Sequence, residues 1–247
     1  MKREIYISIA LMILAVGAFF YPRVQHRRFD ARAQEAITEF ARRMDSYRLE
    51  YRERLNISDE YDIVLEEDPR FWLTNVMTGL AIANHRLYLE NQVHLLDPFA
   101  YNHPSFNILP FGLDTDIIGV LSIPRMELMV PIYLGASPQH LNNGAAHVIH
   151  SSFPVGGINT NAVIAGHRNM THGRVFRDIE QLEIGDEVWV ANFIQTMVYE
   201  VVDIMIVEPH ETDALFIQSG RDLVTLVTTH TRRRGNRRYI VVAERVI

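Results

Sequence analysis

The sequence contains no cysteine in its 247 residues, and this absence excludes more than any other feature of its composition. Disulfides, thiolate metal sites and thiol nucleophiles are all excluded. Positive charge is not in excess either: the formal net charge is −6, which argues against a nucleic-acid partner, because nucleic-acid-binding proteins normally present a basic face. Internal repeats and low-complexity tracts are also missing. With 48% hydrophobic residues, the chain is long enough for one sizeable core with additional segments.

Charge is missing altogether from residues 5–21, which are flanked by basic residues on both sides. At 1.5 Å per residue, an uncharged run of this length is just sufficient to span a bilayer core of about 30 Å. No small-residue cleavage site follows Phe19, since Tyr21 and Pro22 come next. We therefore expect a membrane anchor that is retained, with a cleaved signal peptide as the alternative. The flanking charges do not predict its orientation.

Two helical segments are predicted between this anchor and residue 94. Residues 29–54 are rich in charge, and apolar residues such as Phe29, Ala33, Ile37 and Phe40 recur every three or four positions, which is typical of an amphipathic helix on a core. A second helical pattern covers residues 75–93, after an acidic, proline-containing linker at 66–69. Residues 96–112 then combine three prolines and a glycine with four aromatic residues. Such a segment is either a lid over a site or a packed connector.

From residue 117 onward the pattern indicates β-structure. Short runs of β-branched or aromatic residues alternate with glycine, proline and asparagine, and we predict strands at 117–123, 130–133, 162–165, 187–191, 197–207, 224–228 and 239–246. Residues 175–182 have helical spacing, which suggests one short helix between strands. Seven or eight strands at this density favour a closed or nearly closed barrel.

Polar side chains capable of catalysis stand at the ends of three of these strands. His167 follows a strand after Gly166, Thr228 and Thr229 end another strand, and Arg238 begins the last. A hydroxyl, an imidazole and a guanidinium are the groups needed for a nucleophile, proton transfer and stabilisation of an oxyanion. Because all three occupy strand ends, we predict that they share one groove.

Three motifs in this region resemble those of the sortase family, and of its pilus-assembling class C in particular. Residues 225–229 (TLVTT) resemble the family's T-L-x-T-C strand, and Arg238 follows Thr229 at the expected spacing of nine residues. Residues 162–168 (AVIAGHR) resemble the segment that carries the family's histidine. Upstream, Asp97, Pro98 and Phe99 match the class C lid motif of aspartate, proline and an aromatic residue. The resemblance covers nearly the whole chain.

The resemblance implies a mainly β fold: an eight-stranded sortase-type β-barrel with short inserted helices, preceded by an N-terminal helical region and the membrane anchor. We accordingly expect an anchor or signal segment at residues 1–28, a helical region at 29–94, a lid loop at 95–113 and the catalytic barrel at 114–247. It places the barrel on the extracellular face of the membrane of a Gram-positive-type bacterium.

The implied reaction is cofactor-independent cysteine transpeptidation. A thiolate attacks the Thr-Gly bond of an LPXTG-type sorting signal, and an amine, a pilin lysine in class C, resolves the acyl-enzyme. His167 acts as acid and base, Arg238 holds the oxyanion, Asp97 and Phe99 fill the groove at rest, and Thr228 and His147 belong to the substrate groove.

One residue departs from the family pattern at the centre of the site: Thr229 occupies the position of the catalytic cysteine. A threonine hydroxyl is secondary, hindered and un-ionised near neutral pH, so we predict very little sortase activity. An engineered inactive form, a natural pseudoenzyme that binds sorting signals and a threonine-based chemistry each fit this substitution. A second departure is the arginine-rich segment 231–237, which is either a solvated loop or an attractor of acidic groups.

Two readings from other classes remain open at this stage. His147, His150, His167 and His172 crowd one region, which raises a metal-binding enzyme, although no carboxylate stands at a recognisable ligand spacing and we expect no metal. The other reading is a membrane-tethered barrel that captures LPXTG-like peptides without cleaving them.

Overall fold

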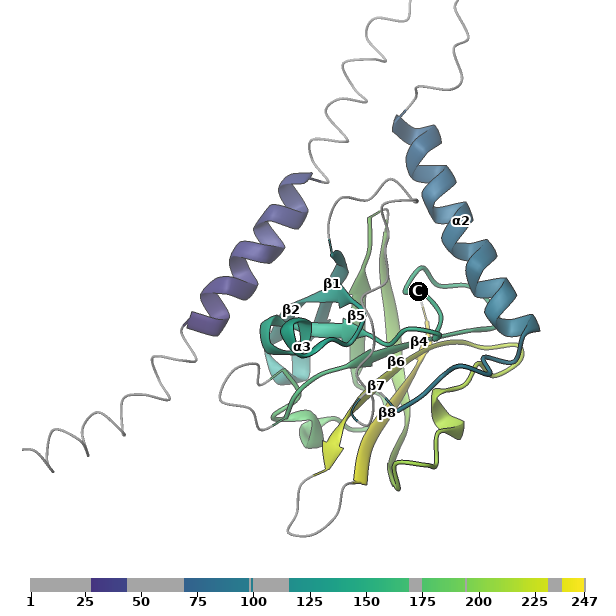
Figure 1. Ribbon diagram of the computed structural model, residues 1–247. Helices are drawn as coiled ribbons and strands as arrows, with labels where there is room; N and C mark the ends of the chain where they lie inside the picture. Colours follow the sequence, from purple (N-terminus) through teal and green to yellow (C-terminus); the bar gives the residue numbers. More distant parts are fainter. Residues whose placement is uncertain are drawn as a thin grey trace, which may run out of the picture.

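Eight β-strands form a closed barrel in the computed structural model, which describes residues 28–43, 69–97, 99, 116–168, 175–193, 195–230 and 237–246 (Figure 1). The order around the barrel is β1-β2-β3-β4-β7-β8-β6-β5. The strand bounds are Ile117–Ile123 (β1), Leu128–Leu134 (β2), Ala145–His147 (β3), Thr160–Ala165 (β4), Glu187–Ala191 (β5), Thr196–Val207 (β6), Asp222–His230 (β7) and Arg237–Arg245 (β8). The predicted eight-stranded, mainly β fold is therefore confirmed.

Alternation along the strands separates two apolar clusters. The first fills the barrel interior and takes side chains from all eight strands, among them Val224 and Leu226 of β7. The second lies on the outer face of β3, β4, β7 and β8 and includes Val227, Ile240 and Leu95. Because successive side chains of a strand point to opposite faces, β4, β7 and β8 are buried on both sides. Their continuous β-branched runs reflect this double burial.

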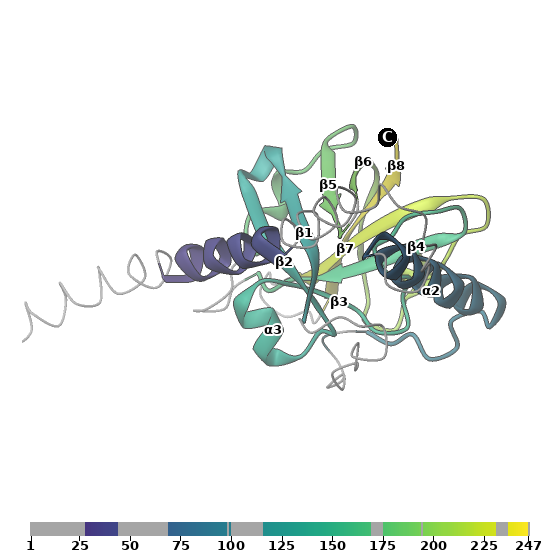
Figure 2. The same cartoon turned by 90° about the horizontal axis from the view of Figure 1, so that it is seen from above.

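Two helices stand on different sides of the barrel, as Figures 1 and 2 show. The first covers residues 28–43 and buries Ala33 and Phe40, whose ring lies 5.4 Å from that of Phe193. The second, α2, runs from Pro69–Leu89. Both predicted helices exist, with α2 displaced toward the N-terminus by a few residues, and residues 44–54 lie outside the described part of the chain.

Polar contacts fasten the end of α2 to the barrel. The buried Asn84 side chain donates from Nδ2 to the carbonyl of Phe153 (3.1 Å) and accepts from the Phe153 amide (2.7 Å). Gln92 donates to the carbonyl of His150 (3.0 Å) and accepts from the amide of Ile217 (2.6 Å). These bonds fix the point from which the chain continues toward Asp97.

Local structure differs from the sequence prediction in three places. Residues 175–182 form turns and one 3-10 helix, Ile179–Gln181, rather than an α-helix. Strand β3 was not predicted, because its three residues, Ala-Ala-His, lack β-branched side chains. The short helix α3, Pro138–Asn143, was also missed, although Ser137 caps it by accepting from the amide of His140.

The predicted membrane anchor at residues 5–21 lies outside the described residues. Among the helices that the structure describes, none combines the length and the apolar composition that a membrane crossing requires.

Candidate active site

Strand alternation brings two of the predicted catalytic residues, Thr229 and Arg238, to one face of the barrel. Ala165, Val227 and Ile240 all belong to the outer apolar cluster. Thr229 lies two residues beyond Val227 and Arg238 two before Ile240, so both continue the outer face of their strands, whereas His167 lies two residues past the end of β4.

The pairing of the strands brings the same residues to one level. Thr229 is directly opposite Arg238 in the antiparallel β7–β8 pair. Ala165 is paired with Val227 in the parallel β4–β7 pair, and the Gly166 amide donates to the Val227 carbonyl at 3.2 Å. His167 therefore follows the end of β4, next to the last residues of β7, which include Thr229.

Thr228 lies on the other face of β7. Its side chain is fully buried, and its hydroxyl donates to the carbonyl of Gly166 at 2.7 Å. This bond ties the end of β7 to the segment that carries His167. The structure thus does not bring the Thr228 hydroxyl to the face that Thr229 occupies.

Gly166 is required by close packing rather than by a turn. A Cβ atom at this position would lie 2.6 Å from Cδ2 of Phe176. The glycine therefore allows the backbone just before His167 to lie against the ring of Phe176.

The segment that leads into the barrel contacts the candidate site through Asp97 and Phe99. Asp97 and Arg238, both almost fully buried, form a bidentate ion pair in which Nε donates to Oδ1 at 2.8 Å and a terminal nitrogen pairs with Oδ2. The amide of Phe99 also donates to Asp97 Oδ1, at 3.2 Å. Such a fork-shaped contact is among the stronger polar interactions in proteins. Pro98, the third predicted lid residue, lies outside the described residues.

Phe99 contacts both the arginine and the histidine. The centre of its ring lies 5.5 Å from Cζ of Arg238 and 6.0 Å from the centre of the His167 ring. Burial lowers the pKa of His167 below its ordinary value, which favours the neutral imidazole. Asp97 and Phe99 thus contact two of the predicted catalytic residues, Arg238 and His167.

A charged cluster behind the site was not anticipated from the sequence. Arg168 pairs with Glu180 at 2.7 Å, and the same carboxylate lies 3.5 Å from Nδ1 of His230. The ring of His230 stacks on Tyr239 with centres 6.1 Å apart. These contacts join the ends of β4, β7 and β8 on the face opposite Thr229. Nothing in the local sequence around Glu180 distinguishes it from a surface residue.

His147 is placed apart from these residues. It lines a pocket between α2 and the barrel, and neither His167, Thr229 nor Arg238 contributes to that pocket. Its Nε2 lies 3.0 Å from the carbonyl of Ser152, and its ring stacks on Phe153 at 5.2 Å. Within the described residues, no three histidine, aspartate or glutamate side chains are grouped so that they could hold a metal ion.

Burial gives His147 a predicted effect on stability. Desolvation lowers its pKa from 6.5 to about 4 in the folded protein. The unfolded chain therefore takes up a proton near pH 6.5 while the folded protein resists it, so the free energy of unfolding should fall by about 3 kcal/mol between pH 7 and pH 4. Denaturant unfolding at a series of pH values measures this loss.

The control for this prediction is His147→Gln, whose amide nitrogen can still donate to the Ser152 carbonyl but which does not titrate. Between pH 7 and pH 4, we expect the free energy of unfolding of this variant to fall by about 3 kcal/mol less than that of the parent protein. Substitution of the exposed His85 by Gln should not change the pH dependence of the free energy of unfolding. If the free energy of unfolding of the His147→Gln protein depended on pH as steeply as that of the parent protein, the attribution of this pH dependence to His147 would be wrong.

Comparison with known proteins agrees with this geometry. The Sortase domain model matches residues 121–246, and the chain belongs to the sortase family. Among solved structures, sortase C of Streptococcus pneumoniae is 26% identical, with 80% of this chain and 95% of that chain covered and a TM-score of 0.64. Sortase C2 of Group B Streptococcus pilus island 1 is 28% identical, with 70% and 99% covered and a TM-score of 0.62. Sortase A of Bacillus anthracis is 26% identical over 161 residues, 64% of this chain and 75% of that protein.

Within the family, the structural resemblance is to class C sortases, which include pilus-related enzymes. Sortases are cysteine transpeptidases, and this chain has Thr229 where the family motif has its cysteine.

Proposed function

We propose that the groove around Thr229 binds LPXTG-type sorting signals and that the chain is built as a sortase-type transpeptidase whose covalent step is greatly slowed by threonine. The observation that carries this proposal is the cross-strand pair of Thr229 and Arg238, with His167 at the end of the adjacent parallel strand. This pairing supports the proposal that a nucleophile, a cation for the oxyanion and a proton carrier act on one peptide carbonyl.

In the proposed reaction the oxygen of residue 229 bonds to the carbonyl carbon of the sorting signal's threonine. The bond to the glycine nitrogen breaks, and His167 transfers a proton to that leaving amine. A second amine, for which a pilin lysine is the class C candidate, then attacks the ester and restores the hydroxyl. Arg238 stabilises the oxyanion in both steps once Asp97 has released it.

Threonine limits the first of these steps. Its hydroxyl must lose a proton as it attacks, whereas a cysteine thiol is partly ionised near neutral pH. The lowered pKa of His167 keeps the imidazole neutral and able to accept that proton, but it also makes the imidazole a weaker base. Slow acylation is the expected result.

The proposed setting is the surface of a Gram-positive-type bacterium, where the anchor predicted at residues 5–21 would tether the barrel. The substrates there would be the sorting signals of pilins or other surface proteins. The acidic net charge gives no reason to expect a nucleic-acid partner.

A second candidate function is a sortase-like protein that captures sorting signals without cleaving them. The specific observation in its favour is again Thr229, because the contacts of Asp97, Phe99 and Arg238 do not depend on a thiol. The two candidates share the same peptide and differ in whether any product forms.

The test is a binding titration with a fluorescent LPXTG peptide and a scrambled peptide of the same composition, with product analysis by mass spectrometry. We expect saturable binding of the LPXTG peptide, at least about tenfold tighter than that of the scrambled one. Thr229→Tyr should abolish binding by filling the groove, whereas Thr196→Tyr, on the exposed start of β6, should not.

Equal affinity for the two peptides, or unchanged binding by the Thr229→Tyr protein, would overturn the proposal. Slow cleavage that disappears with Thr229→Ala supports the enzyme, and binding without product supports the capture protein.

A further inference from the structure

The residues that follow His167 and Thr229 in the chain meet at one carboxylate. Arg168 comes directly after His167, and its guanidinium pairs with Oε2 of Glu180 at 2.7 Å. His230 comes directly after Thr229, and its Nδ1 lies 3.5 Å from Oε1 of the same side chain. Glu180 itself belongs to the 3-10 helix between β4 and β5. A third segment of the chain thus contacts the neighbours of two predicted catalytic residues.

His167 lies outside the ladder of strand pairs, because β4 ends two residues before it. Its carbonyl accepts from the amide of Phe176 at 3.0 Å, and the preceding Gly166 lies against the ring of the same phenylalanine. These contacts fix the backbone at and before the histidine. The pair of Arg168 and Glu180 fixes the residue after it.

His230 has a partner in this cluster in either protonation state. Its Nδ1 lies 3.4 Å from Nη1 of Arg168, from which it accepts when unprotonated, and it donates to Glu180 when protonated. Its ring also stacks on Tyr239 of β8. The side chains of Arg168 and His230 are 11% and 16% exposed, so water screens these charges less than those of a fully exposed pair.

We propose that Glu180 is a positioning residue, which fixes the distance between His167 and Thr229 by holding together the residues that follow them. The inference rests on the proposed function, in which His167 exchanges protons with the reacting groups. Glu180 acts from behind the groove, because Thr229 and His230 point to opposite faces of β7. Such positioning matters for a rate, since a misplacement of about 1 Å can slow a reaction about a hundredfold.

The first test needs no activity: the pKa of His167 is followed by NMR in the full chain and in its Glu180→Ala variant. Loss of a negative charge would by itself lower that pKa, whereas release of the ring from its buried position should raise the pKa toward 6.5. We expect the rise. Nuclear Overhauser contacts between the rings of His167 and Phe99, whose centres lie 6.0 Å apart, should weaken at the same time.

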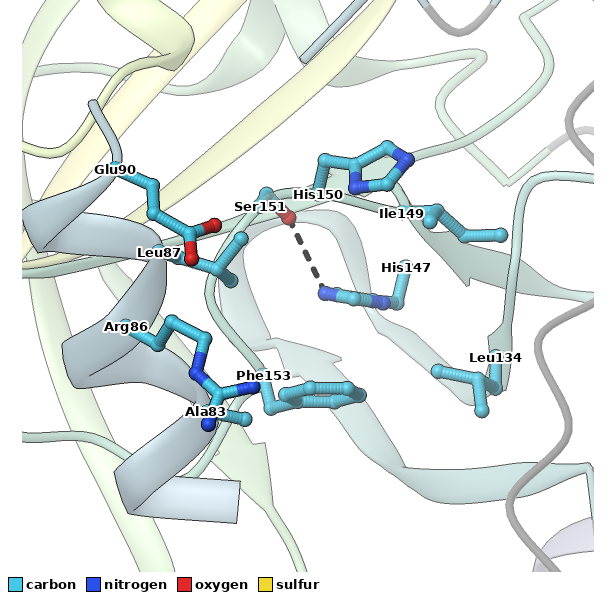
Figure 3. Close-up of a pocket in the computed structure, with 10 residues that line it drawn as sticks. All are labelled: Ala83, Arg86, Leu87, Glu90, Leu134, His147, Ile149, His150, Ser151 and Phe153. Atoms are coloured by element: carbon cyan, nitrogen blue, oxygen red, sulfur yellow. Dashed lines mark hydrogen bonds between the residues drawn. The ribbon is translucent and has the colours of Figure 1, made fainter. Parts of the chain in front are cut away.

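His147 is the internal control in the same spectra. Its ring lines the pocket between α2 and the barrel that Figure 3 shows, to which neither Arg168, Glu180 nor His230 contributes. Burial holds the pKa of His147 at about 4, and Glu180→Ala should leave it there. A substitution that loosened the whole fold would raise both pKa values.

The second test measures peptide cleavage by the Thr229→Cys protein. There Glu180→Ala should lower kcat about tenfold to a hundredfold and leave KM unchanged, because Glu180 positions the reacting groups and does not bind the peptide. When His167→Ala is also present, the same substitution should have no further effect, since nothing is left to position. If the Thr229→Cys protein cleaves no peptide, the proposed function fails, and the NMR test decides the role of Glu180 alone.

Two further variants complete the design. Glu183→Ala removes an exposed carboxylate three residues along, which pairs with Arg125 at 3.1 Å, and it should change neither the pKa of His167 nor kcat. Glu180→Gln keeps an oxygen that can accept from Arg168 and should give a smaller change in the same direction. It replaces the alanine variant if that protein does not fold.

Three results would each overturn the inference: an unchanged or lowered pKa of His167 in the Glu180→Ala protein, an equal loss of kcat with and without the His167 side chain, or equal effects of Glu180→Ala and Glu183→Ala.

Discussion

Thr229→Cys is expected to raise the rate of LPXTG peptide cleavage by about 10³-fold or more and to produce an acyl-enzyme detectable by mass spectrometry. The physical reason is that the thiol is partly ionised and strongly nucleophilic near neutral pH, whereas the hydroxyl is neither. Because Arg238 lies directly opposite residue 229, it also stabilises the thiolate and the oxyanion once the lid has opened. The increase should therefore be larger when Asp97→Ala is added.

The matched control is Thr228→Cys, which introduces the same thiol one residue earlier. That side chain points to the opposite face of β7 and is fully buried, so it should remain inactive. His167→Ala in the Thr229→Cys background should remove most of the gain. If Thr228→Cys proved as active, or if no acyl-enzyme formed even with Asp97→Ala, the proposed geometry of the site would be wrong.

Asp97→Ala is expected to open the lid and to raise the apparent affinity for an LPXTG peptide by about tenfold to a hundredfold. Removing one partner of a buried ion pair leaves an uncompensated charge, at a cost of roughly 3 kcal/mol to the closed arrangement. Arg238 recovers hydration only if the segment around Phe99 moves away, so the open state becomes populated and the peptide no longer competes with the lid. Fluorescence anisotropy measures the affinity, and hydrogen exchange at residues 95–99 measures the opening.

A second readout of the same variant is the pKa of His167, followed by NMR. Burial lowers this pKa in the closed arrangement, so opening the lid should raise it toward the ordinary value. The control is Glu208→Ala, which breaks the exposed Arg237–Glu208 pair beside Arg238. An exposed pair contributes less than about 1 kcal/mol, and neither readout should change. Unchanged affinity and exchange in the Asp97→Ala protein would contradict a lid held by this ion pair.

The strands were predictable because local composition carries their signal. β1 and β5 begin and end where the β-branched runs predict. β4 begins two residues before its predicted run, β7 extends its run by two residues at each end, and β8 begins two residues earlier and ends one residue earlier than predicted. Where the signal is weak, the prediction failed: β3 exists because it pairs with β2 and β4, not because its residues favour a strand. Residues 175–178 form turns, and Phe176 among them lies against Gly166, a contact that the local pattern could not reveal.

The sequence predicted which residues belong to the candidate site, but it did not predict how these residues lie relative to one another. Motif spacing predicted His167, Thr229 and Arg238, and the register pairs Thr229 with Arg238, while His167 follows the end of the neighbouring β4. Spacing assigned Thr229 to the cysteine position but could not show that the Thr228 hydroxyl is buried, since only the position of a strand in the barrel decides which face is buried. It also grouped His147 with the groove, whereas the fold places that ring in a cavity beneath α2.

By itself, the sequence determined that this protein has no thiol, that its C-terminal half is a β-structure with polar strand ends, and that its motifs are those of a sortase with threonine at the nucleophile position. Only the tertiary structure decided that Asp97 and Phe99 cover Arg238 and His167, that Glu180 supports the site from behind, and that His147 faces a separate cavity. The reason is physical. Composition and periodicity are local properties, whereas an ion pair between residues 97 and 238 exists only where the closed barrel brings distant segments together.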